Sequence, residues 1–137
     1  MTSKEFIAQC KEARSEHQEQ VEVVKYLRRK KILHTAVPNG GQRHKKTASD
    51  LKAEGVSAGY PDLIIEEPNK YYHGLRIELK RRAKTLKNGK KSVSHTKVSQ
   101  SQEKWLRELN ERGYYAVVCY GADEAIEVID EYMENRE

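Results

Sequence analysis

Asp62, Glu78 and Lys80 are the residues of this 137-residue chain whose types and spacing most directly indicate chemistry. Asp62 follows a proline and opens the apolar run Leu63-Ile64-Ile65, while Glu78 and Lys80 belong to the alternating stretch Leu75–Lys80. If the two stretches pair as a hairpin, both carboxylates and the ammonium group share one end of a small sheet. Two close carboxylates repel each other unless a cation neutralises them, and their oxygens suit Mg²⁺ or Mn²⁺. The sequence therefore indicates a metal site with a lysine beside it.

The elements that must position these residues follow from the spacing of the apolar side chains. In the second stretch, Leu75, Ile77 and Leu79 point to one face of a strand, and the polar residues between them point to the other. Ser99 and Gln102 form a capping box at the start of a later helix. We expect helices over residues 4–31, 47–54, 100–112 and 123–135, and strands over 32–37, 59–65, 75–80 and 114–120, with Asp62 at the mouth of the second strand.

This order predicts an α/β fold, in which a central mixed β-sheet is flanked by helices in the order α-β-β-β-α-β, followed by a C-terminal helix. A small helical insert lies between the first two strands. The length predicts a single domain over residues 1–137. No apolar run approaches the length of a membrane span.

Charge and cysteine usage restrict the partners and the compartment. The chain has 26 basic and 21 acidic residues, a net charge of +5 and a pI near 9.1, which favours a polyanionic partner. Cys10 and Cys119 lie far apart in no metal-binding spacing, so we expect both to be reduced. An apolar signal peptide is not evident at the N-terminus. We therefore expect a cytoplasmic protein of a bacterial or phage-infected cell, without a membrane partner.

Several short motifs together resemble a known nuclease family. Pro61-Asp62, a gap of fifteen residues and then Glu78-Leu79-Lys80 resemble the signature of the PD-(D/E)XK nuclease superfamily. The surrounding residues are similar to those of the VRR-NUC (virus-type replication-repair nuclease) family, and the similarity extends over residues 16–132. The residues that carry it are Pro38-Asn39-Gly40-Gly41, Gly55-Val56, Gly59-Tyr60-Pro61-Asp62-Leu63, Glu78-Leu79-Lys80 and Gln102-x-x-Trp105-Leu106. This resemblance implies a restriction-endonuclease-like fold and a metal-dependent nuclease that acts on DNA.

The resemblance also implies roles for individual residues. Asp62 and Glu78 would be metal ligands, with the carbonyl group of Leu79 as a third. Lys80 would position or polarise the attacking water and stabilise negative charge on the phosphate. A role of Lys80 as general base would require a strongly lowered pKa.

A helix-borne ligand is a further feature that many members of the superfamily share. Glu16 and Gln20 are the candidates for it, because counting back from Val23 and Val24 places both on one helix face. The alternative is that they form only the polar end of an amphipathic helix. Glu19 ranks third, since this count places it on another face.

Gln102 has two competing interpretations. The capping box assigns it a structural role, whereas the resemblance places it near the active site as a catalytic residue. We expect the two roles to conflict, since a side chain folded back onto the helix cap cannot also reach a phosphate.

Basic residues on both sides of the candidate site are expected to contact DNA phosphates, although charge runs are commonly only solvated surface. They are Arg43, His44, Lys45, Lys46, Arg81, Arg82 and Lys84.

The leading functional hypothesis is a Mg²⁺- or Mn²⁺-dependent endodeoxyribonuclease that acts as a homodimer on branched DNA such as four-way (Holliday) junctions. A two-fold dimer would supply the two identical sites needed for symmetric cuts. Phe6 and Ile7 are candidates for its interface, with residues 84–98 second. A monomeric flap or single-strand nuclease and a non-catalytic DNA-binding module remain alternatives. An RNA-binding protein is disfavoured, because the aromatic stacking motifs of such modules are not evident.

Overall fold

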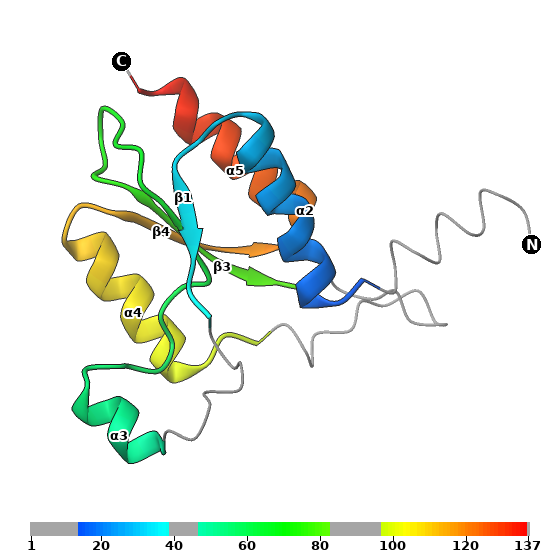
Figure 1. Ribbon diagram of the computed structural model, residues 1–137. Helices are drawn as coiled ribbons and strands as arrows, with labels where there is room; N and C mark the ends of the chain where they lie inside the picture. Colours follow the sequence, from blue (N-terminus) through cyan, green and yellow to red (C-terminus); the bar gives the residue numbers. More distant parts are fainter. Residues whose placement is uncertain (1–13, 39–46, 83–96, 137) are drawn as a thin grey trace, which may run out of the picture.

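The computed structural model describes residues 14–38, 47–82 and 97–136. Figure 1 shows helices and strands in the order that the sequence predicts, including the helical insert α3. The elements are α2 (Glu16–Arg29), β1 (His34–Ala36), α3 (Ala48–Ala53), β2 (Leu63–Ile65), β3 (Leu75–Lys80), α4 (Gln100–Glu111), β4 (Tyr115–Tyr120) and α5 (Ala122–Glu134).

The four strands form one mixed sheet in the order β1-β2-β3-β4. β1 pairs with β2 and β2 with β3 in antiparallel fashion, and the β2–β3 register places Leu63 opposite Ile77. β4 is parallel to β3, with Leu79 opposite Cys119, and α4 forms the crossover between these two strands. The predicted α/β fold with a central mixed sheet is confirmed.

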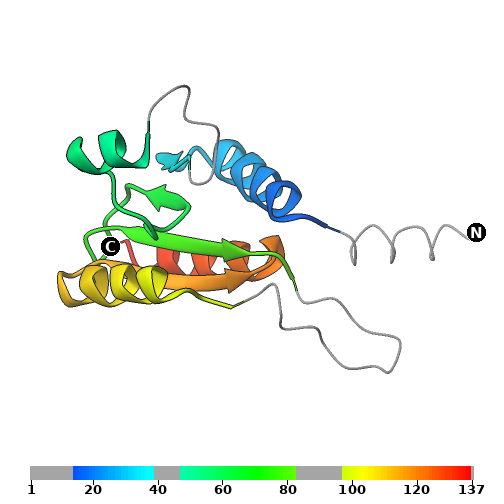
Figure 2. The same ribbon diagram turned by 90° about the horizontal axis from the view of Figure 1, so that it is seen from below.

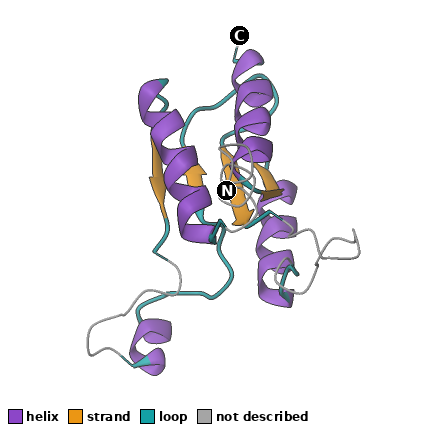
Figure 3. Cartoon of the chain, turned by 90° about the vertical axis from the view of Figure 1, so that its right-hand side faces the viewer, coloured by secondary structure: helices purple, strands orange, loops and turns teal. Residues whose placement is uncertain are grey.

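Helices cover both faces of this sheet. α2 and α5 contact each other and β3 on one face, while α4 packs against β4 on the other. Figure 2 shows α2 and α4 on opposite sides of β3, and Figure 3, which views the strands nearly end-on, shows helices on both sides of the sheet. The covered strand β3 is buried at all six positions. Leu75, Ile77 and Leu79 enter the core, together with Val23 and Leu27 of α2.

The first described helix begins later than the sequence indicates. Ser15 has extended backbone angles (φ −82°, ψ 166°) and is the N-cap of α2. Its side-chain oxygen accepts the Gln18 backbone N–H, and the Gln18 side chain accepts the Ser15 N–H. The prediction of one unbroken helix over residues 4–31 is therefore wrong at Ser15, because this reciprocal capping box starts a new helix. Residues 4–13 lie outside the described part of the chain.

The segment that leads into Asp62 is held by a close contact between backbones. Gly59 has a φ of +93°, and a Cβ atom at this position would lie 2.6 Å from the carbonyl carbon of Ser101 in α4. Only glycine combines this backbone angle with such an approach. The loop therefore rests directly on the start of α4, next to Gln102.

Cys119 is buried and free, as predicted, and Cys10 lies outside the described residues. Of the helices in the described part of the chain, none is both long and apolar enough to cross a membrane.

Candidate active site

Strand pairing brings Asp62 and Glu78 to the same end of the sheet. Asp62 directly precedes β2, and its Oδ2 accepts the backbone N–H of Leu79 at 2.8 Å. This bond holds the Asp62 carboxylate beside the β3 residue that follows Glu78. The hairpin arrangement expected from the sequence therefore places both carboxylates in one site.

The Glu78 carboxyl group lies in surroundings that disfavour its charge. Glu78 as a whole is only 3% exposed. Burial, and next the negative charge of Asp62, raise its pKa to about 8, although the nearby Lys80 ammonium opposes this rise. Glu78 Oε1 accepts a hydrogen bond from Gln102 Nε2 at 2.8 Å and lies 3.6 Å from Lys80 Nζ. Glu78 Oε2 is buried and has no hydrogen-bond partner among the described residues. A buried, unpaired oxygen of this kind costs free energy until something binds it.

A divalent cation fits this arrangement. It would give Glu78 Oε2 a partner and balance the two carboxylate charges. The described residues contain no cluster of three or more His, Cys, Asp or Glu side chains that could hold a metal. Mg²⁺ commonly binds through only one or two carboxylates and takes its other oxygens from water and substrate phosphate. Asp62 and Glu78, together with the Leu79 carbonyl, therefore suit Mg²⁺ or Mn²⁺ better than a metal that needs a complete set of protein ligands.

Gln102 occupies the helix cap and the candidate site at once. Its Oε1 accepts the Ser99 backbone N–H at 2.9 Å, which confirms the capping box, and also accepts from Lys80 Nζ at 3.0 Å. Its Nε2 donates to Glu78. The capping side chain also contacts two site residues, because the amide has an acceptor end and a donor end. The expected conflict between the cap and a phosphate contact stays a prediction. Gln102 thereby orients Glu78 and Lys80 relative to α4.

Glu16 and Gln20, the two helix-borne candidates, line a cavity of about 510 Å³ that Asp62 also lines. The side of α2 that bears them therefore faces the same space as the first carboxylate. Both remain candidates for the helix-borne ligand on the basis of this shared cavity.

Glu19 is fully buried in line with Val23 and Leu27, on the core face of α2. The prediction that Glu19 lies on another helix face is therefore wrong. Glu19, Val23 and Leu27 follow one another at intervals of four residues, which places all three on the face that packs against the core. Glu19 accepts hydrogen bonds from Arg82 Nη2 at 2.8 Å, Arg82 Nε at 2.9 Å and the Arg82 backbone N–H at 3.1 Å. Burial alone would raise the pKa of Glu19, but the bonds from Arg82 and from the Ala122 backbone outweigh burial and lower it.

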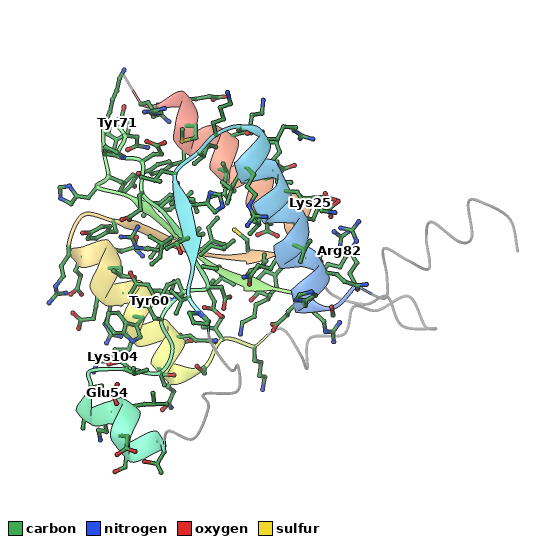
Figure 4. The ribbon with its side chains drawn as sticks, viewed as in Figure 1. Lys25, Glu54, Tyr60, Tyr71, Arg82 and Lys104 are labelled. Atoms are coloured by element: carbon green, nitrogen blue, oxygen red, sulfur yellow. The ribbon has the colours of Figure 1, made fainter. Side chains whose placement is uncertain are left out.

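The basic residues expected to contact DNA separate into three groups. Arg43, His44, Lys45, Lys46 and Lys84 lie outside the described residues. Arg81 is half-buried, and its guanidinium donates to the Arg82 carbonyl at 3.4 Å. Arg82 lies beside α2 (Figure 4). It forms an ion pair with Glu19, so its position is explained by a contact within the protein.

The sequence interpretation assigned no role at the site to two kinds of residue around it. Tyr60 packs edge-on against Trp105 with ring centroids 4.9 Å apart, and Trp105 Nε1 donates to the Ala58 carbonyl at 3.1 Å, which ties the Asp62 loop to α4 (Figure 4). Lys25 and Arg28 line the cavity that Asp62 shares with α2. A signal for Arg28 was present, because it continues the four-residue spacing from Glu16 and Gln20.

The comparisons with known proteins place the chain in the class of nuclease-type domains that process DNA. The VRR-NUC domain model matches residues 4–123, and the chain therefore belongs to the VRR-NUC family. It is similar to a solved structure described as a VRR_NUC domain protein, with 30% sequence identity and a TM-score of 0.68. That similarity covers 91% of this chain and 93% of the other. No curated protein matches the chain significantly.

Proposed function

We propose that this chain is one catalytic domain over residues 1–137, and that it is a Mg²⁺- or Mn²⁺-dependent endodeoxyribonuclease. The observation that carries the proposal is the Glu78 carboxyl group, which lies near Asp62. Its Oε2 is buried without a hydrogen-bond partner among the described residues, and its Oε1 lies 3.6 Å from the Lys80 ammonium. A buried carboxylate beside a second, half-buried one is unfavourable for stability alone, and with a lysine next to it this pair suits a site that binds a cation and a phosphate.

Asp62, Glu78 and the Leu79 carbonyl would hold the cation, with Glu16 or Gln20 approaching from α2. When bound, such a cation supplies Lewis-acid activation of water and of the scissile phosphate. The carboxylates would hold the cation at the end of the hairpin, because the Leu79 N–H and the Gln102 amide fix one oxygen of each.

Lys80 and Gln102 would act on the phosphate group. The Lys80 residue is 8% exposed, and Gln102 Oε1 holds its Nζ in place before substrate binds. A positioned ammonium group in a site with little water strongly stabilises the negative charge that develops on the phosphate oxygens. Gln102 accepts from Lys80 and donates to Glu78, so it keeps the two groups in a constant relation.

The substrate that we propose is branched DNA, such as a four-way junction in repair, recombination or replication, which is cut by a homodimer. Two identical sites related by a two-fold axis match the two symmetric cuts that a junction requires. Arg43, His44, Lys45, Lys46, Arg81 and Lys84 would contact phosphates, and Arg82 would act mainly through Glu19. The cytoplasm, where such DNA lies in a bacterial or phage-infected cell, would be the compartment. A monomeric flap or single-strand nuclease is the alternative.

Cleavage of labelled duplex, flap and four-way-junction DNA tests this proposal. Wild-type protein should cut in Mg²⁺ or Mn²⁺ and lose activity in EDTA. Asp62→Asn, Glu78→Gln and Lys80→Ala should each lose at least about 100-fold in rate, the usual effect of removing a group that stabilises transition-state charge. Mn²⁺ should raise the melting temperature of wild type and of Lys80→Ala, but not of the two carboxylate variants.

Full cleavage by Asp62→Asn or Glu78→Gln would contradict the catalytic assignment. Tight DNA binding by wild type, without cleavage in either metal, would favour the non-catalytic module instead.

A further inference from the structure

The cavity beside α2 extends well beyond the carboxylate that opens onto it. Its wall on α2 reaches from Glu16 to Arg28, and its other wall includes Val37 and Pro38, which follow β1. α2 and β1 run side by side in opposite directions (Figure 1). The cavity is lined by α2, by the two residues that follow β1 and by Asp62. We call this feature the α2 groove. The stretch from Glu16 to Arg28 is about 18 Å long, at about 1.5 Å per residue.

Charge is divided along the α2 groove. The carboxylates Glu16 and Asp62 lie at one end of the groove, next to the C-terminal end of β1. Lys25 and Arg28 line the opposite end, and both are exposed. The wall between them carries His17 and Gln20, which can donate hydrogen bonds, and the apolar Val24. A ligand that fits this groove is therefore anionic at the far end and reaches a metal-binding carboxylate at the near end.

The two groove cations are among the described basic residues that have no acidic partner, unlike five of the described arginines. Arg14, Arg76, Arg82, Arg112 and Arg136 each pair with an acidic side chain. Neither Lys25 nor Arg28 forms an ion pair with the residues that the structure describes. Their charge is therefore not balanced by these neighbours and is available to a ligand in the groove.

We infer that the α2 groove binds one strand of the DNA substrate, with Lys25 and Arg28 contacting phosphates on one side of the scissile phosphate. This inference rests on the proposed nuclease function and adds binding residues that the basic segments 43–46 and 81–84 do not include. A single strand advances about 3.4 Å per nucleotide in B-form DNA, so the groove length corresponds to about five nucleotides. The contacted phosphates should thus lie about three to five nucleotides from the cut.

The salt dependence of binding tests the two cations directly. Labelled duplex DNA is titrated with Lys25→Gln/Arg28→Gln protein in EDTA, over a range of salt concentrations, with fluorescence anisotropy as the readout. Loss of two phosphate contacts should lower the log–log salt slope by about 1.8 relative to wild type.

Arg29→Gln/Lys30→Gln is the matched control. It removes the same charge from the same end of α2, where both side chains lie against the Tyr26 ring instead of in the groove. Its slope should stay close to that of wild type. Equal loss in both double variants would show a general charge effect and would overturn the inference.

Neutral phosphates locate the contact along the DNA. A methylphosphonate placed about three to five nucleotides to one side of the cut should weaken wild-type binding and leave the groove variant unaffected, whereas the mirror position should weaken both equally. The single variants Lys25→Gln and Arg28→Gln replace the double variant in this comparison if the double variant does not fold.

A wild-type enzyme that cuts DNA, but whose response to a methylphosphonate does not depend on Lys25 and Arg28 at any position, would refute the groove assignment and leave the proposed function intact. A wild-type protein that neither binds nor cuts DNA would refute both. Binding of an acidic peptide or of free phosphate that depends on Lys25 and Arg28, together with DNA binding that does not, would also overturn the inference.

Discussion

At the scale of single residues, the acid–base state of Glu78 depends on its neighbours. Burial and the Asp62 charge hold its pKa at about 8, so the metal-free protein keeps Glu78 largely protonated at neutral pH. A cation that binds both carboxylates favours the ionised form and displaces this proton. Metal affinity should therefore increase with pH up to about pH 8, which links the charge of one side chain to occupancy of the site.

This shift predicts how the stability of the metal-free protein depends on pH. The pKa of Glu78 rises from its usual 4.5 to about 8 on folding, so between these values the folded state binds a proton that the unfolded state has released. The contribution of Glu78 is then favourable below about pH 4.5 and is lost as the pH rises towards 8, by at most about 1.4 kcal/mol per pH unit. Glu78→Gln removes this dependence. In EDTA, the melting temperature of the variant relative to wild type should increase between pH 5 and pH 8. A constant difference between the two proteins would contradict the assignment.

At the scale of elements, the site depends on how the Asp62 loop rests on α4. The loop backbone reaches α4 at Gly59, and the next turn of the helix holds Tyr60 through Trp105. The start of α4 in turn provides Gln102, which contacts Glu78 and Lys80. A shift of the loop relative to α4 would therefore move Asp62 away from Glu78 and Lys80.

Gly59→Ala tests this dependence, and Gly55→Ala is its matched control. Both glycines have a positive φ, +93° and +97°, so an alanine pays a similar backbone penalty of about 1–2 kcal/mol at either position. A Cβ at Gly59 would lie 2.6 Å from the Ser101 backbone, whereas a Cβ at Gly55 would meet no atom within 4 Å. Gly59→Ala should therefore lower both the unfolding free energy and the cleavage rate well below those of Gly55→Ala. Urea unfolding and single-turnover cleavage measure the two effects. Equal loss in both variants would show that the contact with Ser101 is not needed.

A second link between elements joins α2 to the end of β3. Glu19 is bonded by Arg82, two residues after Lys80, and also accepts the Ala122 N–H at the start of α5. Leaving a buried carboxylate without its partner is costly, so this pair holds α2, β3 and α5 in a fixed relation. The α2 groove and Lys80 depend on this relation, because Glu19 and the groove residues belong to the same helix.

At the scale of the whole molecule, the proposed symmetric cleavage requires a second copy of the chain. We expect a homodimer at micromolar concentration, with Phe6 and Ile7 as candidate contacts outside the described residues. Phe6→Glu/Ile7→Glu should give a monomer that still cuts single strands but no longer makes paired cuts in a four-way junction. Sedimentation equilibrium and product analysis on both strands measure these two properties. A monomeric wild-type mass, or paired cuts by a monomer, would contradict the dimer.

Local patterns in the sequence determined most of the architecture. Alternation in residues 75–80, the Ser99–Gln102 cap and the apolar run of β4 each reflect interactions within a few residues or one strand face, so they could be recognised without the fold. The proximity of Asp62 to Glu78 followed from the same information, because an antiparallel pairing of two short strands leaves few registers that keep the apolar face buried.

Other features were decided only by the tertiary structure, because they depend on residues far apart in the chain. The burial of Glu19 depends on Arg82, 63 positions away, and on the start of α5. Gln102 reaches Glu78 and Lys80 because α4 crosses the sheet directly beside them, an orientation that its capping pattern does not specify. The α2 groove exists because β1 turns back along α2 and ends next to Asp62, so Lys25 and Arg28 lie along a path to the site. Local sequence specifies which side chains share a face of a helix or strand, and packing between elements decides what that face meets.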